Sequence, residues 1–294
     1  MEIRQLATFI RVAQFKSFSR AAESLGYSQS AVTVQIRQLE EELNTRLFDR
    51  MGKRIALTDT GERFFSHACD VISQVNQARM SVAATTELHG TLHIGTIESL
   101  TCLKLPAVLH RYRQHHPKVS IHITVGEPEE LIEQMERGEL DMIYVLDEPL
   151  YSNNWHKLME QREEIVFVAS ASLGEALGGR ELTTEELVQY PFFLTEQDNY
   201  RRVLNRRLAA RRCILTPSLE CSDTSFLIRM LEIDRGVSFL PWYAVESSVR
   251  QGKLVRLSVA DCYISLYRQI FCHKEKWRTR EMDEFVRFAE QEDK

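Results

Sequence analysis

Two amphipathic helical segments, separated only by "GYS" at residues 26–28, constrain the fold of this chain more than any other feature. Gly26 can adopt the left-handed conformation that ends a helix, and Ser28 can cap the helix that follows. A connection of three residues makes the two helices cross, so the stretch predicts a helix-turn-helix. The second helix has an apolar stripe at spacings of four, three and four residues: Val32, Ile36, Leu39 and Leu43.

The flanking segments extend this motif to a winged helix-turn-helix domain over residues 1–58. Leu6, Phe9 and Ile10 begin one face of an earlier helix. The later string "RLFDRMGKRIALT" has two extended arms around a Gly-containing turn, which is typical of a β-hairpin wing. Cations near that turn are expected to contact DNA phosphates or the minor groove, although a solvated hairpin tip is the alternative; they are Arg50, Lys53 and Arg54.

The polar face of the second helix has the residue types of a base-reading surface. Thr33 and Arg37 each follow a buried position by one residue, about 100° round the helix, and Ser30 aligns with them. Gln29 stands at the N-terminal tip, where it can pair with adenine in the major groove, and free N–H groups beside Ser28 suit a phosphate. The alternative is a solvated face with Ser28 only as a cap. The preceding turn and the wing favour DNA.

Residues 59–89 predict a linker helix, since the stretch from Asp59 to Gly90 contains no proline. Its apolar positions recur at heptad spacing, which favours a dimerising helix over one that packs on its own domain. The predicted dimerisation seam is Phe64, Ala68, Val71, Val75, Ala78 and Val82.

Residues 90–294 predict an α/β effector domain with largely parallel sheets. Short apolar runs such as "TLHIGTI" and "LDMIYVL" alternate with amphipathic helices. About 200 residues with two groups of βα units suggest two lobes, with ligand chemistry at strand ends or between the lobes.

Charge and composition restrict the classes of function. The net charge is −5, but residues 1–60 hold nine Lys/Arg against seven Asp/Glu, so the acidity lies in the rest of the chain. Local field rather than total charge decides DNA binding. The N-terminus is interrupted by charges and no apolar run reaches the roughly 20 residues of a membrane span, so we expect a cytoplasmic protein without membrane contact.

The sequence contains none of the common motifs of catalysis or metal binding. The sequence has no nucleophile elbow, zinc-protease motif, phosphate loop or dinucleotide fingerprint, so we expect no enzyme, no catalytic residues and no cofactor. His93 and His122 should lie in neighbouring strands, and interior or rim histidines are favoured over metal ligands. The six cysteines are expected to be reduced, although Cys213 and Cys221 are close enough in sequence to leave a redox role open.

The chain resembles the LysR-type transcriptional regulators. "SFSRAAESLGYSQSAVTVQIRQLEEELNTRLFDR" is similar to the helix-turn-helix of that family almost throughout, and "GKRIALTDTGERF" resembles its wing and linker start. "LHIGTIESL", "GELDMIYV" and "RGVSFLP" are similar to strings of its regulatory domain. Val34 departs from the family, which often has a basic residue there; the valine removes a phosphate or base contact and offers one to a thymine methyl.

The resemblance implies a two-lobed, periplasmic-binding-protein-like α/β effector domain behind the winged domain and linker helix. Lobe I would comprise 90–161 and 268–294, and lobe II 162–267. It also implies a dimer, or a tetramer built as a dimer of dimers, that binds promoter DNA. Such a regulator is expected to respond to a small molecule bound between the lobes and to work with RNA polymerase. A two-lobed solute-binding protein is the alternative, but it leaves residues 1–90 unexplained and would need an export signal.

The resemblance also indicates an effector site. Family members hold an effector with the hydroxyl residue that matches Ser99, at the end of the first regulatory strand. Neighbours at strand ends are candidates to join it, although each could be only a helix cap or surface residue. Their acidic side chains favour a cationic or amphoteric effector unless Arg201 or Arg202 turns inward. The remaining candidates are Glu98, Thr101, Leu146, Asp147, Thr195 and Glu196.

Overall fold

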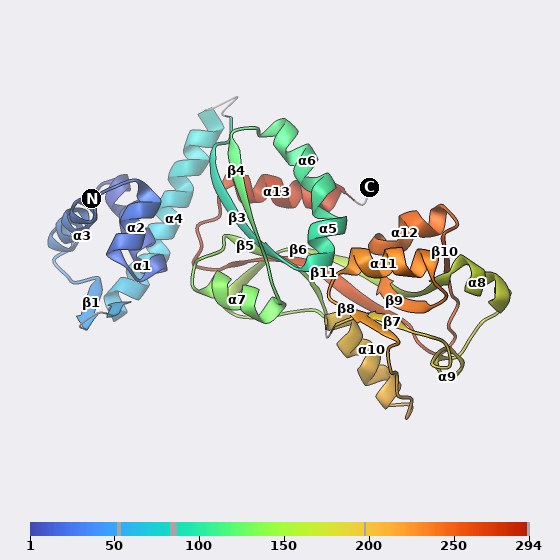
Figure 1. The fold of residues 1–294 in the computed structure, drawn as a ribbon. Helices are drawn as coiled ribbons and strands as arrows, with labels where there is room; N and C mark the ends of the chain where they lie inside the picture. The colour runs from blue at the N-terminus through green and yellow to red at the C-terminus, as the bar shows by residue number, and fades with distance from the viewer. Residues whose placement is uncertain (52–53, 83–86, 197, 293–294) are drawn as a thin grey trace.

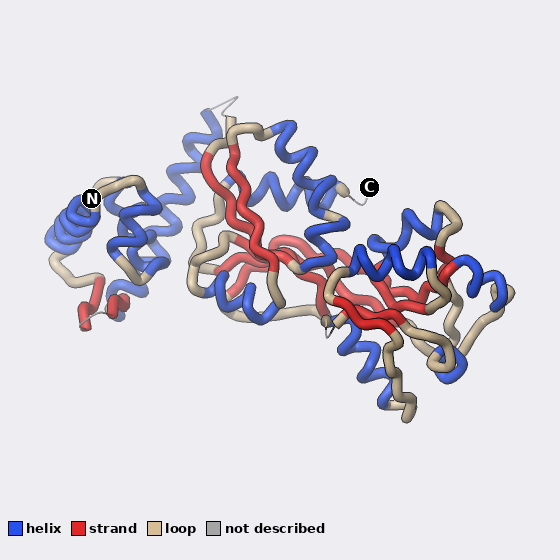
Figure 2. Tube along the Cα trace, viewed as in Figure 1, coloured by secondary structure: helices blue, strands red, loops and turns tan. Residues whose placement is uncertain are grey.

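The computed structural model describes residues 1–51, 54–82, 87–196 and 198–292. A small helical domain at the N-terminus leads through one long helix into an elongated α/β region, in which two lobes follow one another (Figure 1). The strands run from one lobe into the other through the middle of this region, as the colouring by secondary structure shows (Figure 2). Within the described residues, no helix has the length and apolarity needed to cross a membrane.

The N-terminal domain contains three helices and a two-stranded hairpin, as expected. Gly26 ends the second helix in the left-handed conformation at φ 68°, and its N–H bonds back to the helix carbonyls. Ser28 caps the third helix by accepting from the backbone N–H of Ala31 at 3.2 Å. The elements are α1 (Ile3–Phe15), α2 (Phe18–Leu25), α3 (Gln29–Glu42), β1 (Phe48–Met51) and β2 (Arg54–Leu57), with β1 and β2 antiparallel.

Aromatic side chains from all parts of this domain form its core. Phe9 of α1 is fully buried, with its ring 5.3 Å from that of Phe48 in the hairpin and 5.2 Å from that of Phe64 in the long helix. Such ring pairs stabilise a core beyond their buried area. The hairpin and the long helix are therefore fixed to the three-helix unit by packing.

The long helix α4 (Asp59–Val82) buries a different stripe from the predicted seam. Phe65, Ala68 and Ile72 are buried against the N-terminal domain, with Ala68 only 1% exposed. Val71 lies on another side and is 40% exposed, and Val75 is half-buried. Phe64 and Ala68 are thus used by their own domain, because the inner face of α4 completes its core. The side chains of Ala78 and Val82 lie outside the described residues.

The main sheet has the strand order β10 (Leu254–Arg256), β6 (Trp155–Ser170), β11 (Ile264–His273), β5 (Met142–Asp147), β3 (Gly90–Thr96) and β4 (Val119–Val125), with β9 (Val237–Pro241) also paired to β6. In the first lobe β3 (Gly90–Thr96) is parallel to β4 (Val119–Val125) and β5 (Met142–Asp147). β5 is buried on both faces: Met142 and Tyr144 pack beneath α6 and α13, whereas Ile143 and Val145 pack beneath α7. The helices are α5 (Glu98–Leu103), α6 (Leu105–His115), α7 (Pro128–Glu136) and α13 (Arg280–Gln291).

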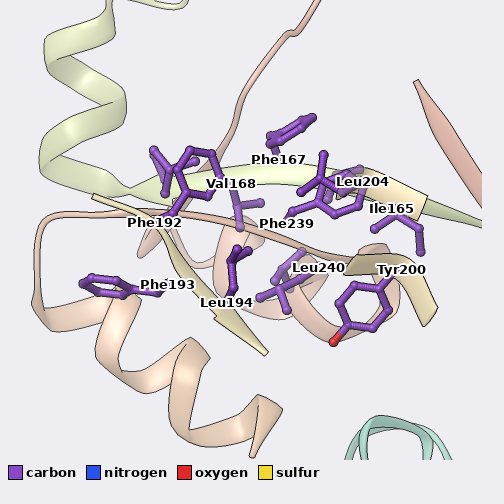
Figure 3. Close-up of a cluster of buried hydrophobic side chains, with 14 of the residues drawn as sticks. Ile165, Phe167, Val168, Phe192, Phe193, Leu194, Tyr200, Leu204, Phe239 and Leu240 are labelled. Carbon is purple, nitrogen blue, oxygen red and sulfur yellow. The ribbon is translucent and has the colours of Figure 1, made fainter. Parts of the chain in front are cut away.

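The second lobe is built on the parts of two long strands, β6 (Trp155–Ser170) and β11 (Ile264–His273), that extend beyond the first lobe. Its core gathers Phe167 and Phe239 from antiparallel strands around Leu204 and Phe192, and Tyr200 stands at one side of this cluster (Figure 3). A small parallel pair completes it: β7 (Phe193–Thr195) and β8 (Leu219–Cys221). The other elements are β9 (Val237–Pro241), β10 (Leu254–Arg256), α8 (Ala171–Leu177), α9 (Thr184–Leu187), α10 (Asn199–Ala209), α11 (Thr224–Ile233) and α12 (Trp242–Arg250).

Two antiparallel strands, β6 (Trp155–Ser170) and β11 (Ile264–His273), connect the lobes. This corrects the expectation of largely parallel sheets, since each crossing strand pairs antiparallel with its neighbours. The guanidinium of Arg268 contacts the carboxylate of Glu163 at 2.8 Å and the hydroxyl of Tyr144 at 3.0 Å, and all three side chains are buried. The register places 162 opposite 267 and 161 opposite 268, so the expected crossing points are neighbours in the sheet.

The N-terminal domain also contacts the first lobe directly. The side-chain amide of Gln14 donates to the carbonyl of Glu275 at 3.2 Å, and Trp277 packs against the N-terminal core. Nearby, Lys276 pairs with Asp141 at 2.6 Å in a largely buried position. Burial there lowers the pKa of Arg11, which Asp141 partly offsets. The two domains therefore share a polar, partly buried contact besides the linker helix.

Candidate functional site

The N-terminus of α3 presents an exposed polar tip. The hydroxyls of Ser28 and Ser30 lie 3.0 Å apart, and both side chains are exposed. The amide oxygen of Gln29 accepts a hydrogen bond from the hydroxyl of Ser19 at 3.1 Å. Ser19 belongs to α2, so this contact orients the side chain of Gln29. The amide N–H groups of Gln29 take no part in it.

The next turn of α3 carries Thr33 and Arg37. The Thr33 hydroxyl donates to the carbonyl of Gln29 at 2.9 Å, so its oxygen remains as an acceptor. Arg37 pairs with Glu41 at 3.1 Å, and both side chains are exposed; such a pair is weak and readily exchanged for a phosphate. Val34 is 46% exposed on the same helix.

The wing is attached to α3 by a carboxylate. Glu40 accepts from the backbone N–H groups of Leu47 at 2.8 Å and Phe48 at 3.2 Å. The sequence reasoning did not find this contact. The backbone of Arg50 lies in β1 opposite Ile55, and that of Arg54 in β2 opposite Met51. Their side chains, and the whole of Lys53, lie outside the described residues.

A cavity of 610 Å³ lies between the two lobes, at the carboxyl ends of the parallel strands. Pockets of 300–1,000 Å³ are the usual size for small-molecule sites, and strand ends are their usual place in α/β folds. Its walls come from both lobes: Ile97, Glu98, Ser99, Val125, Gly126, Glu127, Pro128, Glu129 and Leu146 of the first, and Thr195, Glu196, Asp198, Asn199, Tyr200, Ser222, Asp223 and Thr224 of the second.

Five of the predicted effector residues line this cavity, namely Glu98, Ser99, Leu146, Thr195 and Glu196. Thr101 and Asp147 do not. The Thr101 hydroxyl donates to the carbonyl of Ile97 inside its own helix at 2.8 Å. The Asp147 carboxylate accepts from the backbone N–H of Glu148 at 2.7 Å, and burial raises its pKa to about 6. The alternation of side chains along a strand places Leu146 and Asp147 on opposite faces, so only one of them can face the cavity.

Glu98 joins the two lobes. Its Oε2 atom accepts from the backbone N–H of Thr224 at 3.2 Å and from the Thr224 hydroxyl at 2.6 Å, at the N-terminus of α11. Its Oε1 atom is buried and has no strong donor among the described residues, while burial and the Glu98 carboxylate raise the pKa of the nearby Cys102 thiol. A second link between the lobes runs from the Asn199 amide to the carbonyl of Leu146 at 3.2 Å.

The carboxylate of Asp198 is a second largely buried acidic group of the cavity wall. It caps α10 by accepting from the backbone N–H of Arg201 at 2.9 Å, and Thr195 also donates to it. Burial raises its pKa to about 6, although the hydrogen bonds from Thr195 and Tyr200 oppose that shift.

Both arginines that could have neutralised the cavity are bonded to other protein groups, including residues of the wall itself. The guanidinium of Arg201 is 2.6 Å from the carbonyl of Thr195 and 2.6 Å from Glu220. Arg202 pairs with Glu129 at 3.2 Å. Neither is among the residues lining the cavity.

Sequence reasoning missed the lining residues that follow β4 and β8, together with Asp198, Asn199 and Tyr200. A signal for two of them was present, since Asp198 and Asp223 are helix N-caps placed directly after short parallel strands. Such strand-to-helix turns gather at one edge of a sheet, where ligands bind.

The histidine pair and the cysteines do not form a further site. His93 and His122 are opposite one another in the parallel register and stack with ring centroids 4.9 Å apart. Over residues 1–51, 54–82, 87–196 and 198–292, no three His, Cys, Asp or Glu side chains are grouped to hold a metal ion. Cys213 and Cys221 are free thiols.

Family models match nearly the whole chain. Residues 3–62 match the model described as "Bacterial regulatory helix-turn-helix protein, lysR family", and residues 85–294 match "LysR substrate binding domain". The HTH-type transcriptional regulator YwqM of Bacillus subtilis is 31% identical over 291 residues, which cover 97% of each chain. GltR of the same organism is 26% identical over 286 residues, covering 97% of this chain and 95% of the relative.

Solved structures share the fold across the full length. A full-length OxyR variant from Pseudomonas aeruginosa matches with a TM-score of 0.63 at 22% identity, covering 99% of this chain and 95% of that one. Full-length CbnR complexed with its target DNA matches with a TM-score of 0.54 at 19% identity, covering 100% of both chains.

Proposed function

This chain belongs to the LysR family of bacterial transcriptional regulators, and from that membership we propose that a small molecule bound in the interlobe cavity controls its hold on promoter DNA. The chain is a DNA-binding regulator with an effector-binding domain, not an enzyme. The family match over residues 3–62 also removes the solute-binding alternative. The observation that carries the proposal is the 610 Å³ cavity, walled by both lobes and containing Ser99.

We assign sequence reading to the exposed tip of α3. Gln29, Ser30, Thr33 and Arg37 contact base edges in the major groove, and the N-terminus of the helix at Ser28 meets a phosphate. The wing cations Arg50, Lys53 and Arg54 contact the DNA backbone, which fixes position more than sequence. Glu40 supports this division, because it holds the wing against the reading helix.

We further propose that the regulator acts as a homo-oligomer in the cytoplasm. Among the seam residues whose side chains are described, Val71 is exposed and Val75 is half-buried, so this side of α4 is the candidate dimer face. A dimer through this face would place two reading helices on successive half-sites, and a dimer of dimers would extend the contact. We also propose RNA polymerase as a further partner at the promoter.

Gel-shift titration of the full-length protein on a set of promoter fragments tests this function. We expect specific binding to at least one fragment, with an affinity that falls steeply with salt. A metabolite that raises the melting temperature by occupying the cavity should also change that affinity. The function fails if a folded protein shows no preference for any promoter, or if cavity ligands never alter DNA binding.

A further inference from the structure

The described walls of the interlobe cavity carry a strong excess of negative charge. Six carboxylates line it and no lysine, arginine or histidine does: Glu98, Glu127, Glu129, Glu196, Asp198 and Asp223. Glu129 is paired with Arg202, so its negative charge is compensated. A concave site lined by one sign of charge concentrates ligands of the opposite sign.

Two arginines lie beside this wall, and both are held by other protein groups: Arg202 by Glu129 and Asn199, and Arg201 more firmly. Arg201 is buried and is held by the carbonyl of Thr195 and the carboxylate of Glu220, each at 2.6 Å. Releasing it would leave a buried guanidinium unpaired, which is costly. The cavity is therefore poorly suited to an anion.

Glu98 supplies an independent reason to expect a donor on the ligand. Its Oε2 atom accepts from Thr224, whereas its Oε1 atom is buried and has no strong donor in the described part of the chain; the thiol of Cys102, a weak donor whose pKa is raised by burial and by this carboxylate, is close to the Glu98 side chain. A buried carboxylate oxygen left unpaired costs free energy that a donated N–H removes. Resting on the proposed function, we propose that the effector is an organic cation whose ammonium or amidinium group pairs with the carboxylate of Glu98 at the cavity wall.

The rest of the wall fits the body of such a molecule. Ile97, Val125, Pro128 and Leu146 add apolar surface to the cavity lining. A metal ion fits less well, because the described residues contain no group of three or more ligating side chains. An amine with an apolar or mixed chain matches both the acidic and the apolar residues of the lining.

The position of Glu98 also gives the cation a route to regulation. Glu98 opens α5 in the first lobe and contacts the start of α11 in the second. A cation paired with this carboxylate would sit beside a contact that joins the two lobes. Binding therefore favours the closed arrangement by its difference in affinity for the two states.

Matched probes of opposite charge test this inference on the full-length protein. The pairs are hexylamine with hexanoate, putrescine with succinate, and phenethylamine with 3-phenylpropionate, measured by thermal unfolding and titration calorimetry. We expect at least one amine to raise the melting temperature and bind one molecule per chain, while its carboxylate partner has no effect. Glu98→Gln should weaken that amine about tenfold or more, because a charge-assisted hydrogen bond is lost.

Two further variants keep the test clear. Glu127→Gln at the cavity wall should weaken the amine about two- to fivefold, and it serves if Glu98→Gln unfolds. Glu130→Gln, an exposed neighbour on α7 outside the wall, should change binding less than twofold. Stabilisation by carboxylates alone, or by no probe, would overturn the inference. An amine that binds through Glu98 without changing DNA affinity would uphold it and overturn the proposed function instead.

Discussion

The hydroxyl group of Ser99 in the first lobe lies 2.9 Å from the hydroxyl group of Tyr243 in the second. The backbone N–H of Tyr243 donates in turn to Glu163 at 3.2 Å, and Glu163 is the partner of Arg268 on the crossing strand. Burial raises the pKa of Tyr243 well above its ordinary value, so the tyrosine is neutral. A wall residue of the cavity is thus connected to the strands that join the lobes.

Replacing Tyr243 with Phe should blunt the response to the effector without weakening DNA binding in its absence. The Ser99 hydroxyl loses its partner, which should lower the free energy of unfolding by about 1–2 kcal/mol. Urea unfolding and gel shifts with effector measure the two effects. Tyr151→Phe, at an exposed tyrosine, is the matched control and should change neither. A double-mutant cycle with Ser99→Ala should show coupling; strictly additive losses would show that the contact has no energetic role.

Replacing Arg268 with Met should destabilise the protein strongly. Arg268 and Glu163 are 3% and 8% exposed, and burial raises the pKa of Glu163 while Arg268 opposes that shift. Removing the arginine leaves a buried carboxylate without its main partner, at a cost of about 3–5 kcal/mol. Urea unfolding measures the loss.

The ion pair of Glu164, the residue next to Glu163, provides the control for this experiment. Arg256 pairs with Glu164 on the surface at 3.0 Å, with the two side chains 46% and 42% exposed. Arg256→Met should therefore cost less than about 1 kcal/mol. Equal losses in the two variants would mean that the buried pair is no more important than the exposed one.

Replacing Gln29 and replacing Lys53 should have different effects on DNA binding. Gln29→Ala should lower the affinity for the preferred operator by about 1–3 kcal/mol and change base preference. Lys53→Ala should weaken all sequences about equally and reduce the salt slope by about one. Gel shifts on operator and scrambled duplexes at several salt concentrations separate these outcomes. A change of base preference in Lys53→Ala alone would mean that the wing reads sequence.

The helix-turn-helix was predictable because its signals are local. Gly26 and Ser28 specify the turn by their own backbone and side-chain chemistry, and the stripe through Val32 and Ile36 needs only the helical period. The seam on α4 was less predictable, because a single period cannot tell which partner an apolar face meets. Ala68 is buried against its own domain, whereas Val71 is exposed, and only tertiary packing decides between them.

The residues of the cavity were partly predictable, because some of their sequence signals are also local. Ser99 and Thr195 follow apolar strand-forming runs, and the ends of parallel strands meet at one edge of the sheet. The contact of Glu98 with Thr224 joins positions 126 residues apart, and no local pattern specifies it. The antiparallel crossing strands that set the two lobes side by side were also beyond local periodicity.

Raising the pH from about 4.5 to 7.5 should destabilise the folded protein through Asp198. Burial raises the pKa of this carboxyl from 3.8 to about 6. Between those values the folded chain keeps a proton that the unfolded chain has already lost, so stability falls as pH rises through this interval. Above about pH 6 the penalty is complete and should be on the order of 1–3 kcal/mol.

Asp198→Asn isolates this contribution, because asparagine also caps helices well but does not titrate. Urea unfolding of both proteins at four pH values from 4.5 to 7.5 should show the wild type losing stability relative to the variant across this range. Asp147 shares the raised pKa of about 6 and is present in both proteins, so its effect cancels in the difference. Parallel stability curves would mean that the Asp198 carboxylate is better solvated, or better bonded, than its burial indicates.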